Sequence, residues 1–546
     1  MTALNTWSDA VFRYIDDIGF KIVAETGEVS DRYHLGKIVL KCFREDPEFL
    51  LQIDGATNER DTFGSMLEKS IRCAEAFRNL GIKQGDVIVL MASTCLDLTA
   101  PMYACFYLGV SAACIDMTLQ KEELLNAFND AKPKFVFCLG SKAVAVQEAL
   151  NQLGIEAEIA TYGKEASFNT FPEFLEKYSD NGSVQDFQPE DFDPKDTIGL
   201  LVSTSGSTGF PKTAALSHSN LINGLPNLWV NFRKYPTPTR LALIISPVQW
   251  LSALVHFVMS PIFKYTRLQS SLPITQQHVY EMINKYRPTY LISSPTFMTT
   301  LLRPGDRDQC DFSSMEHIYL GGSVVSQEVV NELKIVQPNA QVFVGYGLSE
   351  CSGLCFNYVQ AVRGSCGTPV GQYQYRIVDI DTQKIIEDAN VSGELWIKGP
   401  AVFKGYWNRP NDTMQALTED GWLRTGDIMY RDESWNFYFV DRMKLLLKYR
   451  NHQVSPAELE NVIRKHPSVL DVAVTGIRDL ECGDLPVACV ITKDSNVTED
   501  EIKDLVKASL SDSKQLRGGV IFMKELPTTS TGKVDRPRLK AMVNSS

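Results

Sequence analysis

One stretch of this chain gathers the residue types that bind phosphate. From Ser203 to Lys212 it reads Ser-Thr-Ser-Gly-Ser-Thr-Gly-Phe-Pro-Lys. Small residues let a backbone wrap closely around an anion, so that successive N–H groups and hydroxyls can donate to its oxygens. Lys212 adds a mobile positive charge at the end. The uncharged run 199–202 before it predicts a buried strand, which favours a nucleotide phosphate loop over the alternative of a Ser/Gly-rich surface linker.

The loop differs from a Walker A loop. In that motif a glycine directly precedes the lysine and a helix begins at this point, whereas this chain has Pro211 there. It resembles instead the phosphate loop of the acyl-adenylate-forming superfamily, which contains acyl-CoA synthetases, 4-coumarate:CoA ligases, beetle luciferases and the adenylation domains of peptide synthetases. The resemblance implies that ATP is bound here by Ser203, Thr204, Ser205, Gly206, Ser207, Thr208, Gly209 and Lys212.

A second segment, Gly-Tyr-Gly-Leu-Ser-Glu at 345–350, resembles the adenine and metal segment of the same superfamily. An aromatic ring at Tyr346 can stack on the base, and the Glu350 carboxylate is the kind of oxygen ligand that Mg²⁺ prefers. By itself the hexapeptide is equally consistent with a Gly-rich turn. The nucleotide contacts that the resemblance implies in this segment are Gly345, Tyr346, Gly347 and Ser349.

Two segments further along resemble the ribose and hinge segments. Asp427 ends the run Gly-Trp-Leu-Arg-Thr-Gly-Asp, and its carboxylate can accept hydrogen bonds from both ribose hydroxyls. In Asp-Arg-Met-Lys at 441–444, the resemblance implies that Arg442 contacts the ribose or a phosphate and that Lys444 lies at the hinge. In isolation these residues would be an ordinary Gly-Asp turn and a solvated charged turn.

The stretch 527–536, Pro-Thr-Thr-Ser-Thr-Gly-Lys-Val-Asp-Arg, resembles the catalytic-lysine loop of the superfamily. Activating a carboxylic acid on the α-phosphate of ATP brings two anions together. A lysine between them offsets the repulsion and stabilises the charge that develops in the transition state. Lys533 is the candidate, although a single terminal lysine would otherwise be a solubilising surface charge.

The resemblance also implies where the acid and the CoA thiol bind. The acid pocket is expected at Trp250, Ser252, Gly321, Gly322 and Ser323, and the CoA path at Lys448, Arg450 and Asn451. By contrast, Gly393–Pro400 and its continuation Gly-Tyr-Trp at 405–407 are interpreted as scaffold.

The chain departs from the family pattern at three positions. Thr213 replaces the glycine after the loop lysine, and a β-branched residue resists the backbone angles that glycine permits. Trp250 stands near the usual pocket histidine, which argues against luciferin oxidation and predicts a reshaped acyl pocket. Asn451 replaces a glycine beside the CoA thiol, so we expect robust adenylation and weakened or re-routed thioester formation.

The elements that must position these residues belong to an α/β fold. Apolar runs at 86–90, 134–138, 290–292 and 341–344 alternate with helical patterns, which predicts a layered α/β domain with a largely parallel sheet. Short strands at 375–398 predict a small β-barrel-like subdomain. We expect an N-terminal adenylation domain at 1–440 and a small, mobile α+β lid domain at 441–546, whose first helix begins at the N-cap Ser455.

Composition limits the possible functions. The net charge of −12 argues against a nucleic-acid partner. Twelve cysteines without paired spacing predict free thiols in a reducing compartment. The uncharged stretches 98–115 and 241–263 are each interpreted as a buried strand followed by a buried helix rather than a membrane span. Without a visible signal peptide or a C-terminal Ser-Lys-Leu, the cytoplasm is the expected location, with the peroxisome as an alternative.

The leading hypothesis is an acid–CoA ligase that uses ATP, Mg²⁺ and CoA, with a fatty acid as the expected substrate and aromatic propenoic acids as the alternative. Three other functions stay open: a luciferase-like monooxygenase, an adenylating enzyme that loads a separate carrier protein, and a degenerate nucleotide-binding paralogue. The oligomeric state is not indicated by the sequence.

Overall fold

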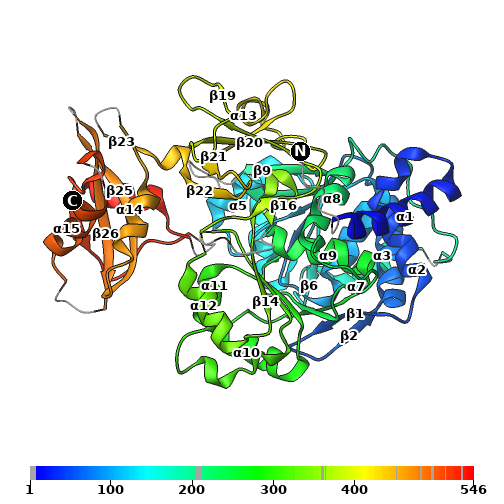
Figure 1. The fold of residues 1–546 in the computed structure, drawn as a ribbon. Coiled ribbons are helices and arrows are strands. Elements are labelled where there is room, and N and C mark those ends of the chain that lie inside the picture. The colour runs from blue at the N-terminus through cyan, green and yellow to red at the C-terminus, as the bar shows by residue number, and fades with distance from the viewer. Residues whose placement is uncertain are drawn as a thin grey trace. The chain divides into compact units, whose positions relative to one another are not determined.

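The computed structural model describes residues 8–180, 182–204, 212–323, 325–357, 362, 364–449, 452–479, 482–493, 497–510, 512–529 and 533–545 (Figure 1). These residues form two compact units. Of the described residues, one unit contains those from Ser8 to Gln374 together with Lys398–Leu423, and the other contains Tyr375–Ile397 together with those from Arg424 to Ser545. The sequence predicts a different division, between residues 440 and 441, which places the small β-rich subdomain in the first domain. This domain boundary stays a prediction.

The first unit contains two seven-stranded sheets, each mostly parallel, as the alternating pattern predicts. One sheet has the order β7-β6-β5-β3-β4-β8-β9. Its strands are β3 (Val87–Met91), β4 (Ser111–Cys114), β5 (Phe135–Leu139), β6 (Glu158–Tyr162), β7 (Asn169–Thr170), β8 (Ile198–Thr204) and β9 (Lys212–Ser217). Only its last pair, β8 with β9, is antiparallel.

The other sheet of this unit has the order β14-β13-β12-β10-β11-β1-β2. Its strands are β1 (Leu50–Asp54), β2 (Arg60–Thr62), β10 (Leu241–Leu243), β11 (Thr266–Gln269), β12 (Tyr290–Ser293), β13 (His317–Leu320) and β14 (Gln341–Val344). A three-stranded antiparallel sheet follows, with β15 (Tyr346–Leu348), β16 (Gly353–Asn357) and β17 (Thr368–Pro369).

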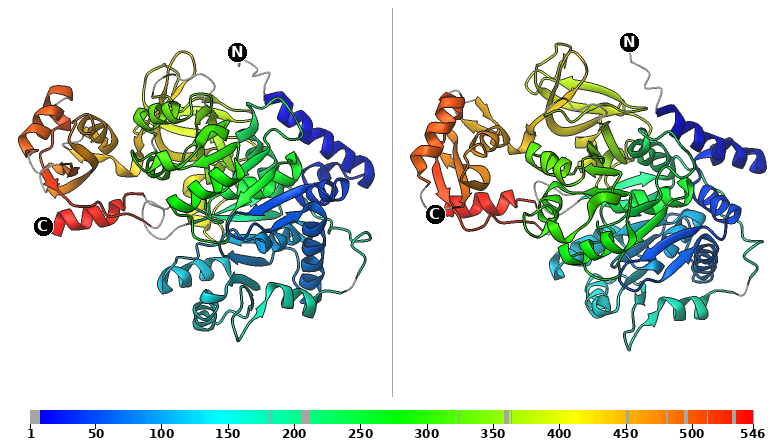
Figure 2. Two further views of the ribbon diagram at one scale, coloured as in Figure 1. Left: turned by 90° about the horizontal axis from the view of Figure 1, so that it is seen from below. Right: turned by 60° about the horizontal axis from the view of Figure 1, so that its bottom comes forward.

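Helices cover both faces of these sheets, as in doubly wound α/β proteins. In Figure 2, the N-terminal helix α1 (dark blue) lies on the outside of the first unit. The helices of this unit are α1 (Ser8–Thr26), α2 (Leu35–Glu45), α3 (Phe63–Asn79), α4 (Thr99–Leu108), α5 (Lys121–Ala131), α6 (Ala143–Leu153), α7 (Phe171–Tyr178), α8 (His218–Gly224), α9 (Leu251–Phe263), α10 (Gln276–Tyr286), α11 (Pro295–Leu301), α12 (Gln327–Val336) and α13 (Pro410–Ala416).

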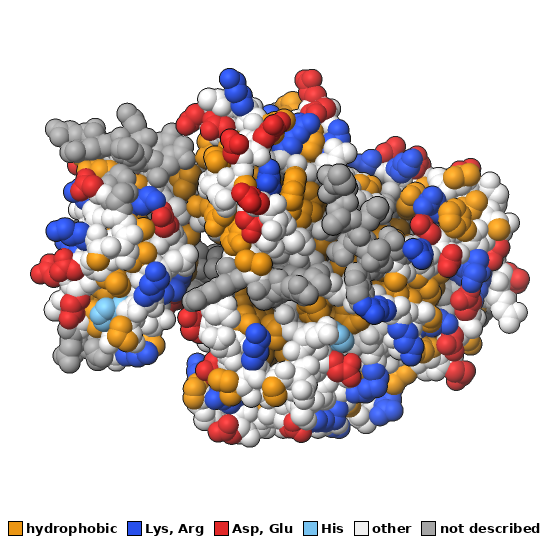
Figure 3. Space-filling view, in the orientation of Figure 1, with side chains coloured by type: hydrophobic (Ala, Val, Ile, Leu, Met, Phe, Trp, Pro, Cys, Tyr) orange, Lys and Arg blue, Asp and Glu red, His pale blue; other side chains and the backbone are white. Residues whose placement is uncertain are grey.

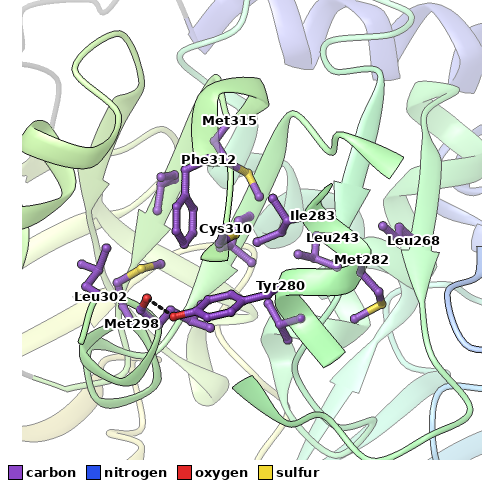
Figure 4. Packing of buried hydrophobic residues seen from close by; sticks show 14 of the residues in the cluster. Leu243, Leu268, Tyr280, Met282, Ile283, Met298, Leu302, Cys310, Phe312 and Met315 are labelled. Atoms are coloured by element: carbon purple, nitrogen blue, oxygen red, sulfur yellow. Dashed lines mark hydrogen bonds between the residues drawn. The ribbon is translucent and has the colours of Figure 1, made fainter. Parts of the chain in front are cut away.

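Helices α10, α11 and α12 pack on one face of the second sheet through a cluster of buried aliphatic and aromatic side chains. Leu291 and Ile318 contribute to it from β12 and β13. Figure 4 shows the Tyr280 ring from α10 within this cluster, with its hydroxyl donating to the Leu301 carbonyl at 2.6 Å. This hydrogen bond satisfies the one polar atom that the ring brings into the core.

The two uncharged stretches lie in the core of this unit. The stretch at 241–263 begins with β10 and ends with α9, whose residues from Ala253 onward are buried, so the predicted strand-then-helix order is confirmed. At 98–115 the predicted order is wrong: helix α4 comes first, and strand β4 follows the left-handed Gly109. Among the described residues, the structure contains no helix long and apolar enough to cross a membrane.

The small β-rich subdomain is an open sheet, so the expected barrel-like form is wrong for the described residues. Its strands are β18 (Gln374–Val378), β19 (Ile385–Ile386), β20 (Gly393–Lys398), β21 (Leu423–Arg431) and β22 (Phe437–Arg442), in the order β19-β18-β20-β21-β22. Its edge strands β19 and β22 do not pair with each other. The short strand β19, with two residues, is too brief to extend the sheet toward closure.

The C-terminal part of the second unit is the predicted α+β arrangement. Its strands are β23 (Leu447–Tyr449), β24 (His452–Val454), β25 (Val469–Asp479), β26 (Gly483–Thr492) and β27 (Gly519–Phe522), and its helices are α14 (Pro456–Ile463), α15 (Glu499–Ser509) and α16 (Arg536–Ser545). The predicted N-cap of α14 is confirmed, because the Ser455 hydroxyl accepts from the Glu458 N–H at 3.1 Å. The same hydroxyl donates to Asp441 Oδ2 at 2.5 Å, which ties the helix to the end of β22.

A buried ion pair joins α14 to α16. Arg536 donates to Glu460 Oε1 at 2.8 Å and to Oε2 at 3.2 Å, and it also donates to the Val474 carbonyl at 2.9 Å. The Val474 N–H donates to Glu460 at 2.8 Å. Burial raises the pKa of Glu460 above its ordinary value, while Arg536 and this N–H oppose the shift. The pair fixes the start of α16, directly after the loop that carries Lys533.

Replacing Arg536 by Met should leave the Glu460 carboxylate buried without its main cation, at a cost of about 3–5 kcal/mol in the free energy of unfolding. Urea titrations of both proteins measure this difference. Because loss of Arg536 raises the pKa of Glu460 further, protonation should remove the buried charge, and the deficit should shrink from about pH 7.5 to about pH 5.

Arg464→Met is the matched control. Arg464 also approaches Glu460, at 3.7 Å, but its side chain is 41% exposed, so its loss should cost less than about 1 kcal/mol. Equal costs for the two variants, or a deficit of Arg536→Met that does not change with pH, would contradict this account of the pair.

Candidate active site

The predicted phosphate loop connects two antiparallel strands. Strand β8 ends with Thr204 and β9 begins with Lys212, and these two residues pair across the hairpin. The Thr204 hydroxyl donates to the Lys212 carbonyl at 3.1 Å. A strand therefore follows the lysine, which confirms that this is not the strand–loop–helix of a Walker A site. The predicted phosphate ligands Ser205, Gly206, Ser207, Thr208 and Gly209 lie outside the described residues.

Thr213 fits its position in β9. It pairs with Ser203 of β8, and its carbonyl accepts from the Trp407 N–H at 2.8 Å. A β-branched residue is well suited to this extended backbone. Threonine in place of the family's glycine therefore causes no backbone strain at this position of the hairpin.

Tyr406 links the predicted phosphate lysine to the predicted metal ligand. The Lys212 ammonium lies 5.0 Å from the centroid of the Tyr406 ring, within the range of a cation–π contact. The Tyr406 hydroxyl donates to Glu350 Oε1 at 2.8 Å. Lys212 also forms an ion pair with Asp412 of α13. One tyrosine thus contacts a cation at its ring and a carboxylate at its hydroxyl, next to the end of the β8–β9 hairpin.

The segment around Tyr406 lies along the outer edge of β9. The Lys404 N–H donates to the Ala215 carbonyl, and the Ala215 N–H donates to the Gly405 carbonyl, both at 3.0 Å. Gly405 has a φ of +127°, and a Cβ there would lie 2.5 Å from Cγ2 of Thr413, so glycine is required. The sequence analysis interprets this segment as scaffold and does not single out Tyr406, for which the Gly-Tyr-Trp motif at 405–407 is the available signal.

The remaining predicted residues of this unit follow the carboxyl ends of neighbouring parallel strands. Gly321–Ser323 follow β13, and Gly345–Glu350 follow β14. The two segments touch, because the Gly345 N–H donates to the Leu320 carbonyl at 3.1 Å. Ligands of open α/β sheets bind at this edge, outside the carboxyl ends of the strands. The Tyr346 ring, expected to stack on adenine, stacks here on Phe356 with 5.4 Å between ring centroids.

Trp250 and Ser252 lie at the start of α9, after strand β10. Trp250 is the N-cap residue of this helix and is partly exposed. The Ser252 hydroxyl donates to the Ser246 hydroxyl at 2.8 Å. Because β10 neighbours β12 in parallel, this segment lies at the same edge of the sheet as the glycine segments after β13 and β14.

In the second unit, Asp427 and Arg442 face each other across β21 and β22. Arg442 Nε lies 2.7 Å from Asp427 Oδ1, and the aspartate side chain is only 1% exposed. The preceding Gly426 adopts a φ of +69°, and its N–H donates to the buried Glu394 at 3.0 Å. Arg442 therefore fixes the predicted ribose carboxylate, and the Gly426–Glu394 hydrogen bond fixes the backbone just before it.

Lys533 lies in a loop closed by backbone hydrogen bonds. The Thr529 N–H donates to the Lys533 carbonyl, and the Asp535 N–H donates to the Pro527 carbonyl, both at 2.8 Å. Loss of hydration lowers the pKa of Lys533 below its ordinary value; Arg442 acts in the same direction and Asp427 opposes it. Lys533 thus shares an electrostatic environment with both predicted ribose residues.

The CoA-path residues can be placed only in part. The backbone of Lys448 belongs to strand β23, whereas Arg450 and Asn451 lie outside the described residues.

In the described parts of the chain, no group of three or more His, Cys, Asp or Glu side chains could hold a metal ion. Mg²⁺ commonly binds through one or two carboxylates together with substrate phosphates, so the single carboxylate of Glu350 fits such a site.

The face shown in Figure 3 carries Lys and Arg side chains interspersed with Asp and Glu. The described residues on this face therefore form no continuous basic surface of the kind that nucleic acids bind.

Comparisons with known proteins agree with this arrangement. Residues 41–407 match the family described as AMP-binding enzyme, and residues 458–533 match the AMP-binding enzyme C-terminal domain. The chain is 31% identical over 500 residues to luciferin 4-monooxygenase of Photuris pensylvanica, covering 89% of this chain and 90% of that protein. It is 28% identical over 510 residues to 4-coumarate-CoA ligase 1 of Narcissus pseudonarcissus, covering 90% of each.

Solved structures show the same fold. ATP-bound MatB from Rhodopseudomonas palustris superimposes with a TM-score of 0.83 at 22% identity, over 93% of this chain and 99% of that one. The luciferase-like enzyme from the nonluminescent Zophobas morio mealworm gives a TM-score of 0.68 at 26% identity, over 75% of this chain and 95% of that one. With the family match spanning most of its length, this chain belongs to the AMP-binding enzymes of the adenylate-forming superfamily.

Proposed function

We propose that this protein is an ATP-dependent acid–CoA ligase. It would convert a carboxylic acid and ATP to an acyl-adenylate and pyrophosphate, and then transfer the acyl group to CoA with release of AMP. The observation that carries this proposal is the link from Lys212 through Tyr406 to Glu350, beside the phosphate hairpin. Relatives named 4-coumarate-CoA ligase add support.

In the first step, a carboxylate oxygen of the acid attacks the α-phosphorus of ATP, and the bond to the pyrophosphate oxygen breaks. Lys212 and the donors of the phosphate hairpin would bind the polyphosphate, and Glu350 would hold Mg²⁺, which neutralises phosphate charge when bound. Asp427 would accept from the ribose hydroxyls. Lys533 would bridge the carboxylate and the α-phosphate, where it stabilises the charge that develops.

In the second step, the CoA sulfur attacks the acyl carbon, and AMP leaves with both electrons of the broken C–O bond. Lys448, Arg450 and Asn451 would line the approach of the thiol. The medium- or long-chain fatty acid expected from the sequence stays a prediction, as does the aromatic propenoic acid alternative.

A luciferase-like activity is the second candidate, because several relatives are named luciferin 4-monooxygenase. Trp250 in place of the pocket histidine argues against it. An adenylating enzyme with another acceptor stays open because of Asn451. Against a degenerate paralogue stand Lys212, Glu350, Asp427, Arg442 and Lys533, which are all present.

Purified protein with ATP, Mg²⁺ and a panel of carboxylic acids should release pyrophosphate only when a suitable acid is present. CoA should accelerate the release, and acyl-CoA should accumulate, as measured by a coupled pyrophosphate assay and mass spectrometry. Acid-dependent release without acyl-CoA would shift the proposal to another acceptor. No release with any acid would refute it.

Lys533→Ala should lower the rate of adenylate formation by at least about 10²-fold, because it removes the charge between the two anions. The same variant should still convert supplied acyl-AMP and CoA to acyl-CoA, since that step does not need this lysine. Lys524→Ala, an exposed lysine before the loop, is the control and should behave as the wild type. Equal loss of both half-reactions in Lys533→Ala would speak against a specific role in the first step.

Asn451→Gly should raise the rate of thioester formation from supplied acyl-AMP, because it removes a side chain from the approach of the thiol. The rate of adenylate formation should stay unchanged in the same protein. Stopped-flow or quench measurements of the two half-reactions separate these effects. An unchanged thioesterification rate would show that Asn451 does not limit this step.

A further inference from the structure

The face of the second sheet opposite to α10, α11 and α12 carries a row of aromatic side chains. Tyr290, Tyr319 and Phe343 come from the neighbouring strands β12, β13 and β14. The Tyr319 and Phe343 rings stack with 4.4 Å between centroids and 15° between planes, and Tyr290 lies 5.4 Å from Tyr319. Tyr290, Tyr319 and Phe343 are 0%, 3% and 6% exposed, so all three rings are buried.

This aromatic row lies directly below the predicted acid pocket. Side chains alternate between the faces of a strand, so Gly321 continues the face of Tyr319, and Gly345 continues that of Phe343. Among the described residues, a Cβ at Gly321 would have only the Gly345 carbonyl oxygen within 4 Å, at 3.1 Å, so this part of the chain leaves space beside Gly321. Two residues of strand span about 6.6 Å, so the open space above Gly321 ends within that distance at the Tyr319 ring.

Described side chains also line one wall and the back of this space. A Cβ at Gly345 would lie 2.4 Å from Cδ1 of Leu354, so Leu354 covers that side. Behind Tyr319, the Trp229 ring stacks on Tyr290 at 4.7 Å, and His256 of α9 lies 5.5 Å from the same ring. Among the described residues, these rings pack behind Tyr319 between the sheet and α9, where a long acyl chain would have to pass.

We propose that Tyr319, supported by Phe343, forms the floor of the acid pocket and restricts the enzyme to compact carboxylic acids. The inference rests on the proposed function, because it assumes that an acid binds above Gly321. It favours short-chain or single-ring acids over the long-chain fatty acids expected from the sequence. Tyr319 is then a specificity-determining residue, since its ring sets the depth of the pocket.

The test uses two non-reactive adenylate analogues, butanoyl- and palmitoyl-sulfamoyl adenosine, and calorimetric measurement of their dissociation constants. The wild type should bind the butanoyl analogue more tightly. Tyr319→Ala should shift the ratio of the two constants toward the palmitoyl analogue by about 10- to 200-fold, because the site of the ring becomes available to the chain. Tyr319→Leu gives a smaller change of volume and serves if the alanine variant does not fold.

Two controls separate the floor from a general loss of packing. Tyr319→Phe keeps the ring and should retain the wild-type ratio. Tyr280→Ala removes a buried tyrosine of α10, which packs against the opposite face of the same sheet (Figure 4), and should also retain the wild-type ratio. A wild type that binds both analogues equally, or an unchanged ratio in Tyr319→Ala, would overturn the inference while the proposed function stands. If the wild type bound neither analogue, both would fail.

Discussion

The contact of Tyr406 with both Lys212 and Glu350 is the interaction on which the rest of the candidate site depends. Adenylate formation requires a carboxylate, a polyphosphate and a metal ion in one place, so positive and negative groups must be held apart at fixed positions. Tyr406 achieves this with one ring: its face lies beside the Lys212 ammonium, and its hydroxyl donates to the Glu350 carboxylate. Gly405 allows the segment to run along β9 and bring the ring there.

The parallel sheets explain why the other residues of this unit come together. The segments that follow β10, β13 and β14 are far apart in the chain. They begin at the same edge of the sheet because the carboxyl ends of parallel strands lie together. In the proposed acid pocket the same geometry would set the depth, since the side chains two residues earlier on each strand would form its floor. In the second unit, the buried pair of Glu460 and Arg536 holds the start of α16, which follows the loop of Lys533.

Local patterns in the sequence predicted local structure well. The apolar runs became β3, β5, β12 and β14, and Ser455 caps its helix, because burial and capping depend on neighbouring residues. The order of α4 and β4 was not predicted, since a short apolar run does not distinguish a buried helix from a buried strand. Tyr406 was missed because its partners lie 56 and 194 positions away in the sequence, and such contacts arise only from the tertiary fold. The predicted phosphate ligands at 205–209 lie outside the described residues, so their roles stay predictions.

The most direct test of the central claim follows an oxygen atom. If the acid attacks the α-phosphorus of ATP, one of its oxygens must remain on AMP after the acyl group is transferred. With an acid that the enzyme activates, labelled with oxygen-18 at both carboxylate oxygens, mass spectrometry should find one labelled oxygen in each AMP and none in pyrophosphate. AMP without label, or label in pyrophosphate or phosphate, would contradict an acyl-adenylate intermediate.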